Sequence, residues 1–197
     1  NVLRNRRRSF VTILITTVAC LSILVAGGFT LYTYHALEEA AARDTGHLTI
    51  ADPRFFTRDE ETPLQFGLND SATLIKALEK DPRVRFALPR VQLTGLISNG
   101  DKSMIFVGTG MDLQAEAAMR GPFLSLIEGN FGQAGVPSVL LGNELAASLN
   151  AHPGTGLTLL ATTTDGAMNA LDVVVSGIVS TGWRDLDKRL VYSDLRT

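Results

Sequence analysis

Hydrophobic residues near the N-terminus form one long run. No Asp, Glu, Lys or Arg lies between Arg8 and Glu38, and residues 10–34 are mostly Ile, Leu, Val, Ala, Phe and small residues. As a helix rising about 1.5 Å per residue, residues 10–34 are roughly 37 Å long, more than the ~30 Å hydrocarbon core of a bilayer. The pattern therefore predicts a transmembrane helix over residues 10–34.

Basic residues flank only the N-terminal side of this run: they are Arg4, Arg6, Arg7 and Arg8. Glu38 and Glu39 follow the other end, where Tyr32 and Tyr34 fit the aromatic belt of a membrane interface. Cytoplasmic flanks carry the excess of Arg and Lys, so the four arginines are the expected topology determinants. They predict a cytoplasmic basic stub over residues 1–9 and an extracytoplasmic body.

Two kinds of export signal are alternatives to a transmembrane helix that stays in the mature protein. Arg7-Arg8-Ser9 is similar to part of a twin-arginine signal, and residues 17–20 are a poor lipoprotein-processing box ending at Cys20. The apolar run continues well beyond Cys20, whereas the apolar region of a signal peptide stops after about 7–15 residues. A retained span is therefore favoured, with the thiol of Cys20 simply packed.

Small residues along the span allow two interpretations. Positions suited to close helix contacts are Thr12, Thr16, Thr17, Ala19, Ser22, Ala26, Gly27 and Gly28. An ordinary single-pass anchor has a similar composition. Gly27 and Gly28 would be either a hinge within the helix formed by the span and the stalk, or positions where another helix packs closely. Close packing is the favoured interpretation.

Beyond the span, the first half of the body reads as a strand, a helix and two strands. Residues 35–45 continue the helical pattern as a stalk, and residues 46–51 alternate as in a strand. Asp70 is the expected N-cap of a helix over residues 71–80. Residues 83–97 and 103–108 are strand-like and are joined by the hairpin signal Asn99-Gly100.

The second half continues as a mixed body. Helices are expected over residues 113–119 and from an Asn143 cap to Leu149, and strands over residues 136–141, 157–163 and 171–179. No repeat of about 20 to 50 residues is visible. The predicted class is α+β: an N-terminal transmembrane helix with a stalk, then a mixed α/β extracytoplasmic domain.

Composition narrows the choice of partners. The chain is 45% hydrophobic and 19% charged, with 18 basic and 20 acidic residues. A net charge of −2 leaves no basic excess for a phosphate backbone, so no nucleic-acid partner is expected. Without the four N-terminal arginines the balance is 14 − 20 = −6, so a basic stub precedes an acidic body.

Catalytic and metal-binding motifs are missing from the sequence. Gly108-Thr109-Gly110 follows a strand but lacks the last glycine of a dinucleotide loop, because Leu113 stands there. The three histidines lie far apart in the sequence, and no nucleophile motif is present. Hence no catalytic, cofactor-binding or metal-ligating residue is assigned.

Trp183 follows the last long strand in a loop with flanking charges. It is either a partner anchor or an ordinary packed tryptophan, and packing is the favoured interpretation.

Several segments along the chain together carry a family resemblance. Two of them are the arginine-rich lead into the span and the strand-like Gly46-His47-Leu48-Thr49-Ile50. The others are Val107-Gly108-Thr109-Gly110-Met111-Asp112 with Glu116, Glu128-Gly129, Val139 to Ala146, and Gly177 to Gly182 with Asp185 and Asp187. In this order they resemble the permease subunits of ABC transporters of the MacB, LolC/LolE and FtsX type. Leu113 replaces the proline usual in the segment that contains Asp112. The best match is to lipoprotein-releasing, LolC/LolE-type members.

The resemblance implies a MacB-like periplasmic core domain carried by the first of four spans. Residues 46–110 would begin its porter-like α/β subdomain, residues 111–182 would form a smaller β-rich subdomain, and residues 183–197 would return towards the first and lead into a further helix. The chain would then be the front half of a permease in the bacterial inner membrane, with its main domain periplasmic or extracellular.

The resemblance also implies partners. A separate cytoplasmic ATPase subunit would bind ATP, so this chain would be a non-catalytic subunit without a cofactor. The other implied partners are a second permease chain, identical or homologous, and membrane lipid. Mechanotransmission through the stalk would release or export a lipoprotein or another amphiphile; no substrate-binding residue is assigned. The alternatives are a single-pass anchored binding or sensor domain and an FtsX-like transmitter to cell-wall hydrolases.

Overall fold

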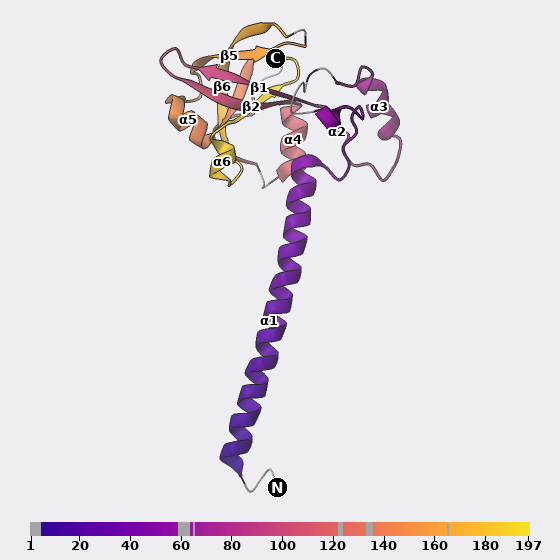
Figure 1. Cartoon of the computed structure of the whole chain (residues 1–197), viewed down its shortest axis with the longest axis vertical. Coiled ribbons are helices and arrows are strands. Elements are labelled where there is room, and N and C mark those ends of the chain that lie inside the picture. The colour runs from indigo at the N-terminus through magenta and orange to yellow at the C-terminus, as the bar shows by residue number, and fades with distance from the viewer. Residues whose placement is uncertain (1–4, 59–63, 65, 122–123, 133–135, 165) are drawn as a thin grey trace. The chain divides into compact units, whose positions relative to one another are not determined.

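A computed structural model describes residues 5–58, 64, 66–121, 124–132, 136–164 and 166–197. The chain divides into two compact units, Asn1–Leu48 and Thr49–Thr197. The first unit is built on α1 (Arg6–Thr45), which Figure 1 shows as one uninterrupted helix. It ends at Gly46, whose φ of 87° is unfavourable for other residues and whose N–H still reaches the carbonyl of Ala42. The long apolar helix followed by a mixed α/β domain confirms the predicted fold class.

The prediction of a strand over residues 46–51 is wrong. This segment contains no strand residue, and none of the described strands pairs with it. Leu48 is 87% exposed and Ile50 is 50% exposed. Alternating residue types make a strand possible, but a strand also needs a partner for its backbone groups.

Two short helices precede the strands of the second unit, α2 (Phe55–Arg58) and α3 (Ser71–Leu78). Helix α3 confirms the expected helix but ends two residues earlier than Lys80. Asp70 occupies its N-cap position without a capping side-chain hydrogen bond, and α3 has no buried residue.

A β-hairpin follows, formed by β1 (Arg90–Ser98) and β2 (Ser103–Met111). Its turn lies at Asn99 and Gly100, as expected: Oδ1 of Asn99 accepts from the N–H of Lys102 at 2.8 Å, and Gly100 has a φ of 93°. Strand β1 begins seven residues later than predicted, because residues 81–84 form a turn closed by Val84 N–H and Asp81 O.

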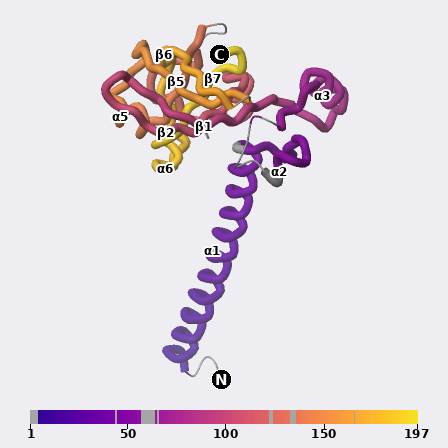
Figure 2. Tube along the Cα trace, turned by 45° about the horizontal axis from the view of Figure 1, so that its top comes forward, coloured from indigo at the N-terminus to yellow at the C-terminus, as the bar shows by residue number. Residues whose placement is uncertain are grey.

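The remaining strands are β3 (Ser125–Gly129), β4 (Ser138–Gly142), β5 (Gly156–Thr162), β6 (Met168–Ser180) and β7 (Leu190–Asp194). All seven belong to one sheet in the order β3-β6-β4-β7-β2-β1-β5, and β5 pairs in addition with β6. That last pairing closes β5, β6, β4, β7, β2 and β1 into a six-stranded barrel. The pairs β2–β7 and β4–β6 are parallel and the others antiparallel. The strands lie together in both views (Figure 1 and Figure 2).

Every strand of the ring sends a side chain into the barrel, as expected for so narrow a barrel. The buried inner residues are Ile97, Phe106, Val139, Leu141, Leu157, Leu159, Val173, Val175 and Val191. Helix α5 (Asn143–Leu149) adds Leu145 and Leu149 to the same cluster. Asn143 is the first residue of α5, and Gly142 occupies the N-cap position. Phe106 needs the glycine beside it, since a Cβ on Gly108 would lie 2.8 Å from the Phe106 ring.

A second cluster lies on the outer face of the same strands. Helix α4 (Leu113–Arg120) packs there through Leu113 against Met111, Leu140, Val179, Leu190 and Tyr192. The outer face of β1 and β2 is not covered in this way: Leu96 lies opposite Ile105 and Thr94 opposite Val107, and all three apolar side chains are exposed.

The predicted boundary at residues 110 and 111 falls at the end of β2. Strands from both sides of this boundary belong to the one barrel, because β2 pairs with β7 and β1 pairs with β5. Residues 190–194, which were expected to lead into a helix, form β7 in the interior of the sheet.

Candidate functional site: the apolar helix and the Trp183 loop

Helix α1 presents apolar side chains on all sides. Within the described residues it is the one helix long and apolar enough to cross a bilayer, and its most apolar window is 0% buried in the chain. Its hydroxyl groups are satisfied locally: Thr12, Thr16, Ser22, Thr30 and Thr33 each donate to the carbonyl oxygen four residues earlier, at 2.8–3.0 Å. A helix in hydrocarbon must satisfy its polar groups internally, and α1 does so for these five residues.

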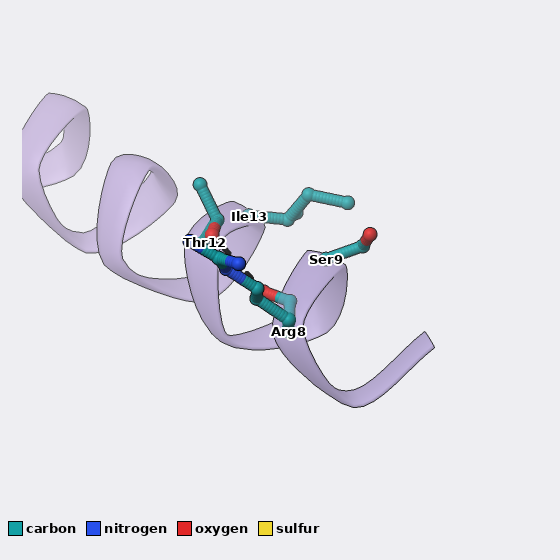
Figure 3. A pocket seen from close by; sticks show the side chains of 4 residues that line it. All are labelled: Arg8, Ser9, Thr12 and Ile13. Carbon is teal, nitrogen blue, oxygen red and sulfur yellow. Dashed lines mark hydrogen bonds between the residues drawn. The ribbon is translucent and has the colours of Figure 1, made fainter. Parts of the chain in front are cut away.

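The basic end of α1 begins at Arg6, with Arg7 and Arg8 in its first turn, while Arg4 lies outside the described residues. Figure 3 shows a shallow hollow here, lined by Arg8, Ser9, Thr12 and Ile13. All four belong to neighbouring turns of the same helix, so the hollow is the flank of a helix and not an enclosed site.

Gly27 and Gly28 lie in the middle of α1, and the helix continues through them. A Cβ at either position would meet nothing within 4 Å in this chain. The space beside them is therefore open to another helix or to lipid. Their role as hinge or packing positions stays a prediction.

Trp183 is exposed on a loop and does not pack in the described chain. Its side chain is 75% exposed, so the favoured interpretation of a packed tryptophan is wrong. The loop joins β6 to α6 (Arg184–Asp187), and Trp183 occupies the N-cap position of α6. Its carbonyl oxygen accepts hydrogen bonds from Leu186 and Asp187 N–H at 3.1 and 3.0 Å.

Asp187 holds this loop in place from inside. The carboxylate is 3% exposed and accepts hydrogen bonds from Oγ of Ser180, from the N–H of Thr181 and from Oγ1 of Thr181, at 2.8, 3.0 and 2.8 Å. Three donors satisfy a buried carboxylate that would otherwise be costly to bury. In the sequence, Asp187 stands out only as part of a family pattern, and no local signal indicates this role.

Gly142 lets the β4–α5 corner approach the same loop. A Cβ at this position would lie 2.3 Å from the carbonyl oxygen of Asp187, which is backbone and cannot move aside cheaply. Helices α5 and α6 lie side by side as a result (Figure 1).

Charged residues follow Trp183 in the chain and form ion pairs. Arg184 donates to Glu144 at 2.9 Å, and Lys188 donates to Asp185 at 2.7 Å. The hydrogen bond from Lys188 lowers the pKa of Asp185, and the hydrogen bond to Glu144 raises the pKa of Arg184. Both pairs are exposed, so each contributes little to stability.

A buried charge network lies at α4. Glu116 is fully buried; its Oε1 accepts from Nε of Arg90, and its Oε2 accepts from Nη2 of Arg90 at 2.9 Å and from Nε of Arg120 at 3.0 Å. Arg120 also donates to Oη of Tyr192 at 2.8 Å. Asp112 caps the same helix by accepting from the N–H groups of Gln114 and Ala115. The family-like segment that contains Asp112 and Glu116 is therefore structural, and Arg90 and Arg120 had no signal in the sequence.

The described residues bring together no group of three or more His, Cys, Asp or Glu side chains that could hold a metal ion. His35 faces Glu38 at 3.7 Å, and His152 faces Glu128 at 3.9 Å. Gly108 and Gly110 lie inside β2, not in a loop. A small hollow of about 170 Å³ lies between β3 and α5, and its lining mixes three alanines and two isoleucines with Glu128, Asn143, Asn150 and His152.

Two solved structures resemble the chain. The extracellular domain of a noncanonic ABC-type transporter, YknZ, from Gram-positive bacteria aligns with a TM-score of 0.48 and 12% identity, over 65% of this chain and 65% of that one. A domain of a protein described as a permease, from Porphyromonas gingivalis, aligns with a TM-score of 0.46 and 15% identity, over 62% of this chain and 52% of that one. No family model matches the chain, and no curated protein sequence does.

Proposed function

We propose that this chain is the front part of the permease subunit of an ABC transporter. The observation that carries the proposal is α1, an uninterrupted apolar helix over Arg6–Thr45 that is followed directly by an α/β barrel domain. Such a helix both anchors a domain to a bilayer and is stiff enough to transmit a movement along its axis.

The family-like segments add support, because they fall at positions where the barrel needs those residue types. Gly142 permits the contact with Asp187, and Asp187 holds the loop after β6. Asp112 caps α4, and Glu116 joins α4 to β1. A chain that shares these segments with the MacB, LolC/LolE and FtsX permeases shares the residues that form the corners of this domain.

The proposed mechanism divides the work between subunits. A separate cytoplasmic ATPase binds and hydrolyses ATP, and its dimerisation moves the spans of two permease chains. Arg6, Arg7 and Arg8 hold the start of α1 on the cytoplasmic side, so the barrel lies in the periplasm or outside the cell. The helix then relays the movement to the barrel.

We further propose a lipoprotein or similar amphiphile as substrate. The supporting observation is the exposed apolar group on the outer face of β1 and β2, formed by Leu96, Ile105 and Val107. Contiguous exposed apolar side chains are a feature of surfaces that bind lipid or protein partners.

Two experiments test these proposals. The native gene product, tagged and extracted from its membrane, should have roughly twice the mass of these 197 residues and co-purify with an ATPase. A single-span protein without an ATPase would overturn the transporter proposal and favour an anchored sensor; co-purification with a cell-wall hydrolase and no transport would favour the FtsX-like alternative.

For the substrate, a photo-crosslinking residue replaces Ile105 in the complete transporter, and purified triacylated lipoprotein is the probe. The matched control carries the crosslinker at Met168, which is also exposed but lies on β6. Crosslinking at position 105 alone is the expected result. Equal yields at both positions, or none, would overturn the lipoprotein proposal.

A further inference from the structure

The side chain of Trp183 is the largest apolar group that the barrel domain leaves in water. It is the chain's one tryptophan and is 75% exposed. Leu186, three residues later, is 42% exposed. A tryptophan buries about 150–250 Å² when it is covered, so its exposure forgoes a substantial hydrophobic gain.

Hydrogen bonds within the loop hold the backbone of Trp183 in place. Its own N–H donates to Oγ1 of Thr181 at 3.3 Å, and Oγ1 of Thr181 donates in turn to the buried carboxylate of Asp187. The Trp183 carbonyl accepts from the first turn of α6. Because its backbone is already ordered and its side chain has only two torsion angles, Trp183 loses little conformational entropy when a partner covers it.

The loop carries no net charge, in contrast to the acidic body. Among residues 183–189, the cations Arg184, Lys188 and Arg189 are exposed, and the acids are the exposed Asp185 and the buried Asp187. Glu144 of α5 pairs with Arg184, so three acids balance three cations. Arg189 is exposed and makes no side-chain hydrogen bond or ion pair among the described residues; its charge acts on the carboxylate of Asp185, and its guanidinium N–H groups can still bind an anion.

An indole, an aliphatic side chain and an available guanidinium match the chemistry of a membrane surface. Tryptophan prefers the interface between headgroups and acyl chains, and arginine binds phosphate while its stem contacts apolar groups. In the proposed function, α1 also tethers the barrel domain to a membrane. Tethering raises the effective concentration of lipid around every exposed group of the domain.

We propose that the Trp183 loop, residues 181–189, docks on the bilayer, with Trp183 and Leu186 in the interfacial region and Arg189 on lipid phosphates. The proposal rests on the membrane anchoring that is part of the proposed function, and on no property of the transported substrate. Docking gives the barrel domain a second attachment to the membrane besides α1.

These 197 residues, reconstituted in phosphatidylcholine–phosphatidylglycerol vesicles, provide a direct test, because Trp183 is their one tryptophan. Phosphatidylcholine brominated near the headgroup end of its acyl chains should quench Trp183 strongly, and the emission maximum should be shifted to the blue relative to the urea-unfolded chain. Emission that is unquenched by the brominated lipid would overturn the proposal. If that emission is also protected from acrylamide, a second copy of the chain covers the loop instead.

Two variants control for chance collisions with lipid. W183F/M168W moves the tryptophan to an equally exposed position on β6 and should be quenched weakly; quenching as strong as at position 183 would overturn the proposal.

Leu186→Ser should shift the docking equilibrium about tenfold towards the undocked loop and remove much of the quenching. Flotation of the vesicles measures membrane anchoring by α1 separately from docking of the loop. A chain that floats with the vesicles while Trp183 is unquenched is anchored by α1, and its Trp183 loop is not docked.

Discussion

Arg90 at the start of β1 and Glu116 in α4 lie 26 residues apart in the chain and are joined by two hydrogen bonds between guanidinium and carboxylate. Glu116 is fully buried, and Arg120 approaches its carboxylate from the next turn of α4. The second guanidinium reaches Tyr192 on β7. One carboxylate thus connects the hairpin, the outer helix and an interior strand of the barrel.

Glu116→Gln should destabilise the barrel domain strongly. The change leaves the buried guanidinium of Arg120 without its counter-charge, and breaking a buried pair costs about 3–5 kcal/mol. Urea unfolding of the full chain in detergent, followed by far-ultraviolet circular dichroism of the strands, measures the loss. Glu79→Gln is the matched control at an exposed position and should change the unfolding free energy by less than about 0.5 kcal/mol. Equal effects would contradict the network.

Gly142→Ala should also destabilise the domain, by about 1–3 kcal/mol, because the new methyl group would collide with the backbone carbonyl of Asp187 at 2.3 Å. Gly156→Ala is the matched control, since a Cβ there meets nothing within 4 Å. Thermal melts of both variants provide the comparison. A lower melting temperature for Gly156→Ala than for Gly142→Ala would be evidence against the close contact of α5 and α6.

Asp187→Asn should loosen the Trp183 loop. The amide group places donors where Ser180 and Thr181 already donate, so at least one hydrogen bond to the buried side chain is lost at a cost of about 1–3 kcal/mol. Fluorescence anisotropy of Trp183 should fall, and quenching by brominated lipid should fall with it. Asp185→Asn, at an exposed carboxylate on the same helix, should leave the anisotropy unchanged.

Gly27→Leu/Gly28→Leu should impair transport while the chain still inserts into the membrane. Two large side chains would fill the open space beside the glycines, where close approach to a neighbouring span is expected. A transport assay in cells, with membrane fractionation to verify insertion, measures both properties. Leu24→Ile/Val25→Leu keeps large apolar side chains on the preceding turn as a control. Normal transport by the double glycine variant would remove both the packing and the hinge roles.

The pH dependence of the segment after α1 follows from Asp52. Hydrogen bonds from the side chain and the backbone of Arg54 lower the pKa of Asp52 from 3.8 to about 2. A carboxylate with a lowered pKa stabilises the folded state above its unfolded pKa, and this stabilisation is lost as the pH falls through about 2. Carboxyl carbon shifts in NMR spectra should show Asp52 still ionised at pH 3. Arg54→Ala should return its pKa towards 3.8, and an unchanged pKa would contradict the hydrogen bonds.

Several elements of the chain follow from patterns of neighbouring residues. Helix α1 follows from the hydropathy of a continuous stretch, and the β1–β2 turn follows from Asn99-Gly100, because each depends on side chains within a few residues. Strands β4 and β6 were found for the same reason, since β-branched and apolar residues are concentrated in them.

The tertiary structure alone decided which of these segments meet. Residues 46–51 alternate like a strand but have no partner among the described strands, whereas residues 190–194 lie between β2 and β4. Closure of the barrel, the burial of Glu116 between two arginines and the holding of the Trp183 loop by Asp187 all join groups brought together by packing. Local residue preferences carry no information on such pairings, because strand partners and buried charge partners are selected by the competition of the whole chain for the same core.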